Sequence, residues 1–412
     1  MREAIQKWNV WWENPARLDE FIGTERDRLP ELMRTLEATH IKDVIGVRRC
    51  GKTVLMYQVI RKLIADGVKA QSISYLNFDD PELGNLEEAI KNTLQLKPDI
   101  THLFLDEIQN INEWEKKIRV YYDRKKFKQI FVSGSSASLV SRDVGKTLTG
   151  RHITRILTPF SFKEFLRYHQ IEHPGQISER EKLIHFLEIY LQEGGFPETM
   201  GKSPLISKTI LVDLYNDILS RDIVSRFDAD LDIVKKIGYY LMSNVGSPFS
   251  YNSAARSLNL HYDTVKKYVP YFEEVFLLFT VSHFSWKVKT QLKKDMKCYS
   301  VDNGLRNAVA FKFSDDLGRL AENAVLVELK RRGKEVYFWK GRKEVDFVLR
   351  EGNKLTAINT TYTDKIPERE KEGLLEFKEK YGDAKLVIIT KELEQTDVDG
   401  IDYIPLWKWL LG

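Results

Sequence analysis

Cysteine is scarce in this sequence of 412 residues, which contains only Cys50 and Cys298. Two cysteines cannot build the disulfide framework of a small secreted domain, and they do not form a zinc site by themselves. Long apolar runs are missing too: the longest, at residues 275–281, falls far short of the roughly 20 residues that a membrane-spanning helix needs. The first residues also lack the apolar stretch of a signal peptide. We therefore expect a soluble, cytoplasmic protein with no membrane partner.

A large excess of one charge is absent as well. The chain has 64 Lys and Arg residues against 60 Asp and Glu, a formal net charge of +4, which excludes a polycationic coat protein. A nucleic-acid site would have to concentrate its basic residues in one region. Hydrophobic residues make up 42% of the chain, enough for a buried core, so general disorder is excluded. The length allows two to four domains of ~100–200 residues each.

Residues 1–159 are predicted to form an α/β domain. Apolar runs that read as strands alternate with segments of helical spacing, such as residues 53–66. This alternation predicts a doubly wound, mostly parallel sheet. Because the runs are apolar throughout, we expect both faces of the sheet to be buried. The five expected strands are residues 41–45, 72–78, 101–105, 129–133 and 153–157.

A phosphate-binding loop follows the first of these strands. The sequence GVRRCGKT fits the pattern G-x-x-x-x-G-K-[ST] and stands between a strand and a helix, as the pattern requires. In such a loop, backbone N–H groups and a helix N-terminus converge on phosphate oxygens. Lys52 would reach the β- and γ-phosphates, and Thr53 would offer a hydroxyl to Mg²⁺. The alternative is a glycine turn with an incidental lysine. The predicted residues for binding ATP or ADP are Gly46, Val47, Arg48, Arg49, Cys50, Gly51, Lys52, Thr53 and Val54.

Two acidic residues, Asp106 and Glu107, end the third expected strand. An acidic pair after a strand is ordinarily a solvated loop, but downstream of a phosphate loop it suits metal-assisted nucleotide hydrolysis. We expect Asp106 to hold the Mg²⁺ shell together with Thr53. Glu107 is then the candidate for polarising the attacking water.

Several further motifs together resemble a known family. They are DEIQ at residues 106–109 with WE at 114–115, SGSS at 133–136, LTGR at 148–151, TPFSF at 158–162 and EGGFPE at 193–198. The set is similar to predicted AAA-superfamily ATPases of archaea and bacteria that carry a C-terminal nuclease-like domain of unknown function. Those proteins are relatives of the STAND and origin-recognition ATPases. The resemblance covers nearly the whole chain.

The resemblance implies additional roles in the ATPase part. Ser135 would sense the γ-phosphate, although a serine-rich turn is an equally simple interpretation. Arg151 would act as an arginine finger in a neighbouring subunit of a homo-oligomer; the alternative is a surface arginine paired with an acid. Residues 160–227 would form a helical lid, whose first helix is expected to be capped by Ser161 with Glu164 three residues later.

Residues 228–310 carry the excess of positive charge. Between 231 and 310 there are 11 Lys and Arg residues but only 6 Asp and Glu. Two short helical patterns, the second capped by Asp263 and interrupted by Pro270, precede two strand-like runs, and this order resembles a winged helix-turn-helix. Such a domain would contact DNA, although winged helices also serve as protein-interaction modules. The candidate DNA-binding residues are Tyr262, Lys266, Lys267, Lys287, Lys289, Lys293 and Lys294.

Residues 311–412 follow the order helix, three strands, helix, strand, which resembles the PD-(D/E)xK nuclease core. Glu322 and Asp346 match acidic positions of that core. Active members place Glu-x-Lys on the next strand, where Asn359 and Thr361 stand in this chain. Asn is a neutral metal ligand, and Thr cannot replace the charge of a lysine. We therefore expect a degenerate, inactive nuclease-like domain in which these four residues are relics.

Three functional hypotheses follow. The leading one is a Mg²⁺-dependent AAA-type ATPase that acts on DNA through the winged helix, with nucleotide contacts repositioning the lid and then the winged helix. The second is a slow nucleotide-gated signalling or scaffold switch that binds a protein partner. The third is an ATP-dependent nuclease, which the loss at Asn359 and Thr361 disfavours.

Overall fold

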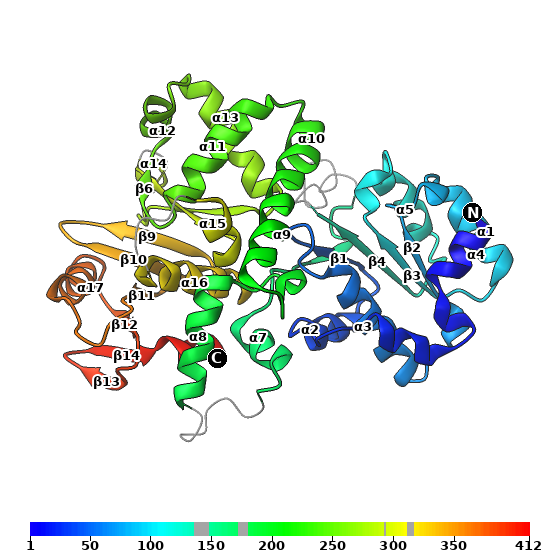
Figure 1. The fold of residues 1–412 in the computed structure, drawn as a ribbon, viewed down its shortest axis with the longest axis horizontal. Coiled ribbons are helices and arrows are strands. Elements are labelled where there is room, and N and C mark those ends of the chain that lie inside the picture. Colours follow the sequence, from blue (N-terminus) through cyan, green and yellow to red (C-terminus); the bar gives the residue numbers. More distant parts are fainter. Residues whose placement is uncertain (136–147, 172–179, 292–293, 311–316) are drawn as a thin grey trace. The chain divides into compact units, whose positions relative to one another are not determined.

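The computed structural model describes residues 1–135, 148–171, 180–291, 294–310 and 317–412. The contacts between residues divide the chain into two compact units, Met1–Leu157 and Thr158–Gly412 (Figure 1). Each unit is described by itself below. In the described part of the chain, none of the helices has the length and apolar character needed to cross a bilayer.

A five-stranded parallel sheet forms the centre of the first unit. The strands are β1 (Ile41–Ile45), β2 (Ile73–Asn77), β3 (His102–Asp106), β4 (Gln129–Gly134) and β5 (His152–Ile156), in the order β2-β3-β4-β1-β5. All four neighbouring pairs are parallel. The residues of β1, β3 and β4 are buried along their whole length, which suits a sheet covered on both faces. The predicted parallel sheet is therefore confirmed.

Helices connect and cover these strands. They are α1 (Arg2–Trp8), α2 (Leu29–Arg34), α3 (Lys52–Ala65), α4 (Leu86–Leu96) and α5 (Trp114–Asp123). The N-terminal segment is tied to the edge strand β2, because the indole N–H groups of Trp11 and Trp12 both donate to the carbonyl of Ile73. Buried tryptophans of this kind combine a large apolar area with a satisfied polar group.

The second unit begins with helices and a π-helical segment. These are α7 (Phe162–Tyr168), α8 (Arg180–Glu193), α9 (Pro204–Asp217), the π-helix η10 (Ile218–Val224) and α10 (Ser225–Phe227). The predicted cap of the first helix is confirmed. The Ser161 hydroxyl accepts from the Glu164 N–H at 3.0 Å, and the Glu164 carboxylate accepts from the Ser161 N–H at 2.8 Å. Together they form a capping box.

Residues 231–309 contain helices and a three-stranded antiparallel sheet of order β6-β8-β7. The chain runs through α11 (Leu231–Ser243), β6 (Pro248–Phe249), α12 (Tyr251–Leu258), α13 (Tyr262–Glu274), β7 (Leu278–Ser282), α14 (Val288–Gln291), β8 (Met296–Ser300) and α15 (Asn303–Val309). In Figure 1, α11, α12 and α13 lie together at the top of this unit. We refer to β7, α14 and β8 as the β7–β8 hairpin.

Three details of this region differ from the sequence-based prediction. The N-cap of α13 is His261, and Asp263 lies inside the first turn. Pro270 also lies inside α13, which continues to Glu274, so the proline does not interrupt the helix. Finally, the expected loop between the two strands contains the short helix α14.

A six-stranded mixed sheet ends the chain, in the order β13-β14-β12-β11-β10-β9. Its strands are β9 (Val336–Lys340), β10 (Glu344–Glu351), β11 (Lys354–Thr360), β12 (Ala384–Thr390), β13 (Gln395–Val398) and β14 (Ile401–Pro405), and its helices are α16 (Leu317–Arg331), α17 (Glu368–Tyr381) and α18 (Leu406–Leu411). The elements predicted up to β12 are present; β13, β14 and α18 are additional.

Alternate residues of the six-stranded sheet join two different cores. Phe347, Ile358 and Val387 belong to a core that also contains residues of α7, α8, α16 and α18. Val348, Ala357 and Leu386 face the opposite core, with residues of α17. This alternation is the period of two expected for strands. The first core thus joins α7 and α8 to the C-terminal sheet.

Candidate functional site

The loop after β1 has the backbone geometry of a phosphate-binding loop. A Cβ atom on Gly46 would lie 2.0 Å from the carbonyl oxygen of Leu157, so no larger residue fits there. Gly51 has a φ of 100° and caps α3, a conformation that favours glycine. The Cys50 thiol is buried and donates to the same Leu157 carbonyl at 3.3 Å. The loop therefore turns sharply and leads directly into the N-terminus of α3.

Lys52 is the first residue of α3 and is only 4% exposed. Its ammonium donates to the carbonyls of Gly46 and Val47 at 3.2 and 3.3 Å and lies 3.8 Å from Oε1 of Glu107. Burial opposes its charged form, but the negative charge of Glu107 and of other nearby groups outweighs burial and raises the pKa of Lys52. The ammonium thus remains charged beside the loop and the acidic pair.

The carboxylate of Asp106, at the end of β3, accepts hydrogen bonds from three hydroxyl groups. Oδ2 accepts from the Thr53 hydroxyl at 2.5 Å and from the Tyr75 hydroxyl at 2.5 Å, and Oδ1 accepts from Ser133. Burial, followed by the charge of Glu107, raises the pKa of Asp106. Carboxylate and hydroxyl oxygens in this arrangement are hard ligands of the kind that Mg²⁺ prefers. The donor set around Thr53 and Asp106 therefore fits a magnesium ion.

Glu107 and Ser135 meet through a residue that the sequence analysis did not select. The amide of Gln109 donates to the Glu107 carboxylate and, at 3.4 Å, to the Ser135 hydroxyl. Glu107 has a positive φ of 50°, and its N–H donates to the Ser133 hydroxyl at 3.2 Å. The signal for Gln109 was present in the DEIQ motif, but spacing alone could not show where its amide points.

Arg151 lies at the end of the sheet where the parallel strands begin, whereas the phosphate loop lies at the end where they finish. The carbonyl of Arg151 accepts from the N–H of Ile41 at 2.8 Å, so it stands at the start of β1, whereas Gly46 follows the end of this strand. At about 3.3 Å per residue, the two positions are about 16 Å apart along the strand direction. Its guanidinium donates to Asp123 at 3.1 Å. Within one subunit, Arg151 is therefore separated from Lys52 and Glu107.

A second missed feature is the segment before β1 that lies against α3. The Gln58 amide of α3 donates to the carbonyls of Ile22 and Thr24 at 2.6 and 2.8 Å. The guanidinium of Arg26, which is 2% exposed, donates to the Cys50 carbonyl at 2.6 Å. These contacts fix the outer side of the phosphate loop. Neither periodicity nor motif spacing marks this segment.

The candidate DNA-binding side chains lie on two elements of the second unit. Tyr262, Lys266 and Lys267 are exposed on α13, and the ammonium of Lys266 lies 5.8 Å from the ring centre of Tyr262. In the β7–β8 hairpin, Lys287, Lys289 and Lys294 are exposed. Lys293 lies outside the described residues.

The four expected relics of a nuclease site gather around one cavity of about 480 Å³, lined among others by Glu322, Asp346 and Thr361. Asn359 is buried beside it, accepting from the Asp346 N–H at 3.0 Å and donating to Glu370 at 2.9 Å. Two residues that were not predicted complete the cluster. Glu344 lies on β10 near Asp346, and the buried Lys297 of β8 reaches both of them. Among the described residues, no group of three or more Asp, Glu, His or Cys side chains is arranged to hold a metal ion. Around Glu322, Glu344 and Asp346, the cation that is present is the ammonium of Lys297.

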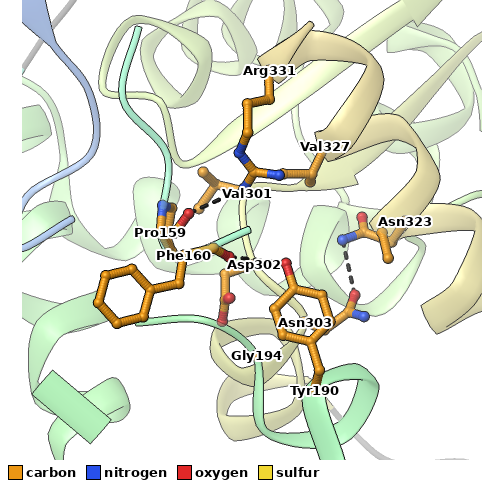
Figure 2. Close-up of a pocket in the computed structure, with 11 residues that line it drawn as sticks. Pro159, Phe160, Tyr190, Gly194, Val301, Asp302, Asn303, Asn323, Val327 and Arg331 are labelled. Atoms are coloured by element: carbon orange, nitrogen blue, oxygen red, sulfur yellow. Dashed lines mark hydrogen bonds between the residues drawn. The ribbon is translucent and has the colours of Figure 1, made fainter. Parts of the chain in front are cut away.

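A buried carboxylate, Asp302, joins the turn at Gly194-Gly195 to the end of β8. Asp302 accepts from the N–H groups of Gly195 at 2.7 Å and Leu305 at 2.9 Å. A Cβ atom on Gly194 would lie 2.2 Å from its Oδ1 atom. Figure 2 shows the adjoining cavity, of about 10 Å³, in which Arg331 reaches the carbonyl of Pro159. The glycine turn is therefore an element of the fold.

Comparison with known proteins gives uncharacterized relatives. An uncharacterized protein of Haemophilus influenzae is 31% identical over 402 residues, which cover 93% of this chain and 97% of the relative. This chain belongs to the same family. An uncharacterized protein of Methanocaldococcus jannaschii, also 31% identical over 400 residues, covers 90% of this chain, and the match spans 88% of that relative.

The models of known domains divide this member of the family into three parts. Residues 38–166 match an AAA domain, and residues 184–316 and 317–409 match two domains of unknown function, DUF8612 and DUF4143. The expectation of an AAA-superfamily core is thus confirmed.

Two solved structures are also similar. The Aeropyrum pernix ORC1 protein in complex with DNA has a TM-score of 0.33 and 12% identity, covering 72% of this chain and 96% of its own. AMPPCP-bound DnaA from Aquifex aeolicus has a TM-score of 0.28 and 19% identity, covering 62% of this chain and 91% of its own.

Proposed function

We propose that this protein binds ATP together with Mg²⁺ and hydrolyses it. One observation carries the proposal: the Thr53 hydroxyl lies 2.5 Å from Oδ2 of Asp106, while the Lys52 ammonium lies 3.8 Å from Glu107. The phosphate loop and the acidic pair are distant in the chain but adjacent in the fold. In the proposed reaction, Lys52 would bind phosphate, Thr53 and Asp106 would bind the metal ion, and Glu107 would be the general base. Nucleotide hydrolysis needs this combination.

Each residue has a defined part in this reaction. The loop N–H groups and Lys52 bind and orient the phosphates, and Thr53 and Asp106 hold Mg²⁺, which neutralises developing charge when bound. Glu107 accepts a proton from the attacking water. The Gln109 amide orients the Glu107 carboxylate and also contacts the Ser135 hydroxyl, which would sense the γ-phosphate. The adjoining loop residues from Gly46 to Val54 complete the nucleotide site.

We further propose that residues 228–310 form a winged helix that contacts DNA. Three observations support this proposal. The order α11, β6, α12, α13, β7, β8 and the β6-β8-β7 sheet suit a winged helix. Its candidate contact residues in the described chain are exposed, and the region carries the positive excess of the sequence. Tyr262, Lys266 and Lys267 would enter a groove, while the hairpin lysines would touch phosphates.

The remaining boundaries and roles belong to the same proposal. In this proposal, residues 1–159 are the ATPase core and residues 160–227 are its helical lid. Residues 311–412 are a nuclease-like domain that has lost its activity. The inactivity rests on Asn359 and Thr361, of which Asn359 is fully engaged in internal hydrogen bonds. Arg151 would complete the ATPase site of a neighbouring subunit in a homo-oligomer.

The test is the rate of ATP hydrolysis by the full chain with and without duplex DNA. We expect Lys52→Ala to lose nucleotide binding. Glu107→Gln, which keeps the shape but not the base, should bind ATP while its turnover falls by about 10²–10⁴-fold. Glu115→Gln, at an acid in the first turn of α5, is the matched control. Normal turnover by Glu107→Gln would contradict the assignment of the base.

DNA binding is tested separately by measuring affinity against salt concentration. Neutralising Lys266 and Lys267 to Gln should weaken binding and reduce the magnitude of the log–log salt slope by about 1.8, because each phosphate contact contributes about 0.9. The control changes Lys125 and Lys126 to Gln. These two exposed lysines are consecutive in the sequence and belong to the first unit. A slow ATPase with no salt-dependent DNA affinity would instead favour a nucleotide switch that binds a protein.

A further inference from the structure

Lys297 is a buried lysine whose ammonium is surrounded by carboxylates. It lies on β8 and is 1% exposed. Its Nζ atom is 3.0 Å from Oε1 of Glu322, 2.7 Å from Oε1 of Glu344 and 3.4 Å from Oδ1 of Asp346. A lysine is almost never buried so completely unless it is paired. Here the pairing is with three acids, all from elements of the C-terminal region.

The alternation of side chains along β8 and β10 explains how Lys297 and its acidic partners come together. Lys297 and Tyr299 lie two residues apart on β8 and therefore point to the same side. Both reach Glu322 of α16, because the Tyr299 hydroxyl donates to the same Oε1 atom at 2.6 Å. Glu344 and Asp346 are likewise two residues apart on β10, where the pairing with β9 shifts register between Val345 and Val348. Such irregularities re-aim side chains.

The oxygens around the ammonium are largely engaged by this chain itself. Besides the contact with Lys297, Asp346 accepts from the Thr360 N–H through Oδ2 at 2.9 Å, and Glu322 accepts from Tyr299. A magnesium ion would need oxygens at about 2.0–2.1 Å in octahedral geometry. A divalent ion shared by the same carboxylates would sit against the positive ammonium. Lysine and metal would therefore compete for one position.

The electrostatics agree with an ammonium in this place. Burial opposes the charged lysine, but Glu322, Asp346 and Glu344 outweigh this effect and raise the pKa of Lys297 well above its ordinary value. Burial and the nearby charge of Glu322 raise the pKa of Asp346 to about 8. Removing the ammonium would thus leave a cluster of partly buried acids short of positive charge.

We propose that Lys297 is the built-in cation of this carboxylate site, occupies the position that a divalent metal ion would take, and fastens the β7–β8 hairpin to the six-stranded sheet. The adjoining cavity of about 480 Å³, which is lined by Glu322, Glu344 and Asp346, provides the path by which an ion from solution could reach the acids once the lysine is removed.

The experiment measures Mn²⁺ binding to the full chain without nucleotide, by electron paramagnetic resonance and by the shift of the Tm. Wild type should gain no Mn²⁺ at this site. Lys297→Ala should bind one additional Mn²⁺ per chain, and saturating Mn²⁺ should raise its Tm by several degrees. Adding Glu322→Gln to Lys297→Ala should abolish both effects. Lys289→Ala, an exposed lysine of the same hairpin, is the control and should behave as wild type.

Three outcomes would overturn the proposal. One is Mn²⁺ binding by wild type that Glu322→Gln removes. Another is a folded Lys297→Ala variant that binds no additional ion. The third is Mg²⁺-dependent DNA cutting by wild type that Lys297→Ala abolishes, because the lysine would then work beside a metal rather than in its place.

A folding failure of Lys297→Ala is handled by a second pair of variants. Lys297→Met combined with Asp346→Asn removes the cation and one acid together, and it should fold better than Lys297→Met alone if the two charges compensate each other. Equal instability of the single and double variants would contradict the proposed pairing.

Discussion

The side-chain amide of Gln109 donates a hydrogen bond to the carboxylate of Glu107, two residues earlier in the chain. The same amide contacts the hydroxyl of Ser135 at the end of a different strand. Glu107 itself has a positive φ of 50°, so its backbone conformation is unusual for a residue with a side chain. The orientation of the proposed base therefore depends on Gln109.

Replacing Gln109 with Ala should lower kcat by about tenfold to a hundredfold, because a general base that is misplaced by about 1 Å loses much of its effect. The affinity for ATP should change little, since Gln109 does not belong to the phosphate loop. The measurement is steady-state ATPase together with a binding titration. Gln6→Ala, at an exposed glutamine of α1, is the control. A rise in KM with unchanged kcat would assign Gln109 to binding instead of positioning.

Arg151 gives a prediction about assembly. Its distance from Lys52 along the sheet means that it can serve an ATPase site only in another subunit. We expect the specific ATPase rate of wild type to rise with protein concentration, and Arg151→Ala to reduce the assembled rate on the order of 10³-fold. ATP affinity at low protein concentration should be retained.

The control separates this role from the ion pair with Asp123. Asp123→Asn removes the negative charge from the same contact but keeps the guanidinium. It should retain activity, because an exposed pair of this kind contributes at most about 1 kcal/mol to stability. Equal loss of activity in both variants, or a rate that does not depend on concentration, would leave Arg151 as a surface residue.

Asp302 predicts a pH dependence of stability. Burial raises its pKa from an ordinary 3.8 to about 6, although backbone N–H groups oppose the shift. A carboxyl with a raised pKa in the folded state contributes its stabilisation fully below the unfolded pKa and loses it as the pH rises through the folded value. The contribution of Asp302 to the free energy of unfolding should therefore fall by about 2 kcal/mol between pH 4 and pH 6.

Asp302→Asn should remove this part of the pH dependence. The comparison is urea unfolding of wild type and variant, followed by tryptophan fluorescence at several pH values from 4 to 7. Because all other groups titrate alike in the two proteins, the difference between the curves isolates Asp302. Asp295→Asn, at an exposed carboxylate, serves as the reference. Parallel curves for wild type and Asp302→Asn would contradict the prediction.

The sequence alone determined the local features of this protein. Apolar periodicity predicted the five strands of the first unit, and glycine spacing predicted the loop from Gly46 to Thr53. The pair Ser161 and Glu164, three residues apart, predicted the capping box. Such signals act between near neighbours in the chain, where backbone geometry fixes what can meet. The position of Asp106 and Glu107 near the phosphate loop could also be predicted. The pair and the loop both lie where strands of a parallel sheet end, and the C-terminal ends of such strands lie on the same side.

Only the tertiary structure decided which distant residues meet. The parallel pairing of β1 with β5 put Arg151 at the edge away from the phosphate loop, and the strand order brought Ser135 within reach of Gln109. Lys297 looked like one more basic residue of a hairpin, yet it is buried among Glu322, Glu344 and Asp346. Whether a lysine is solvated or paired depends on the elements packed around it, and these lie tens of residues away, where no periodicity in the sequence records the contact.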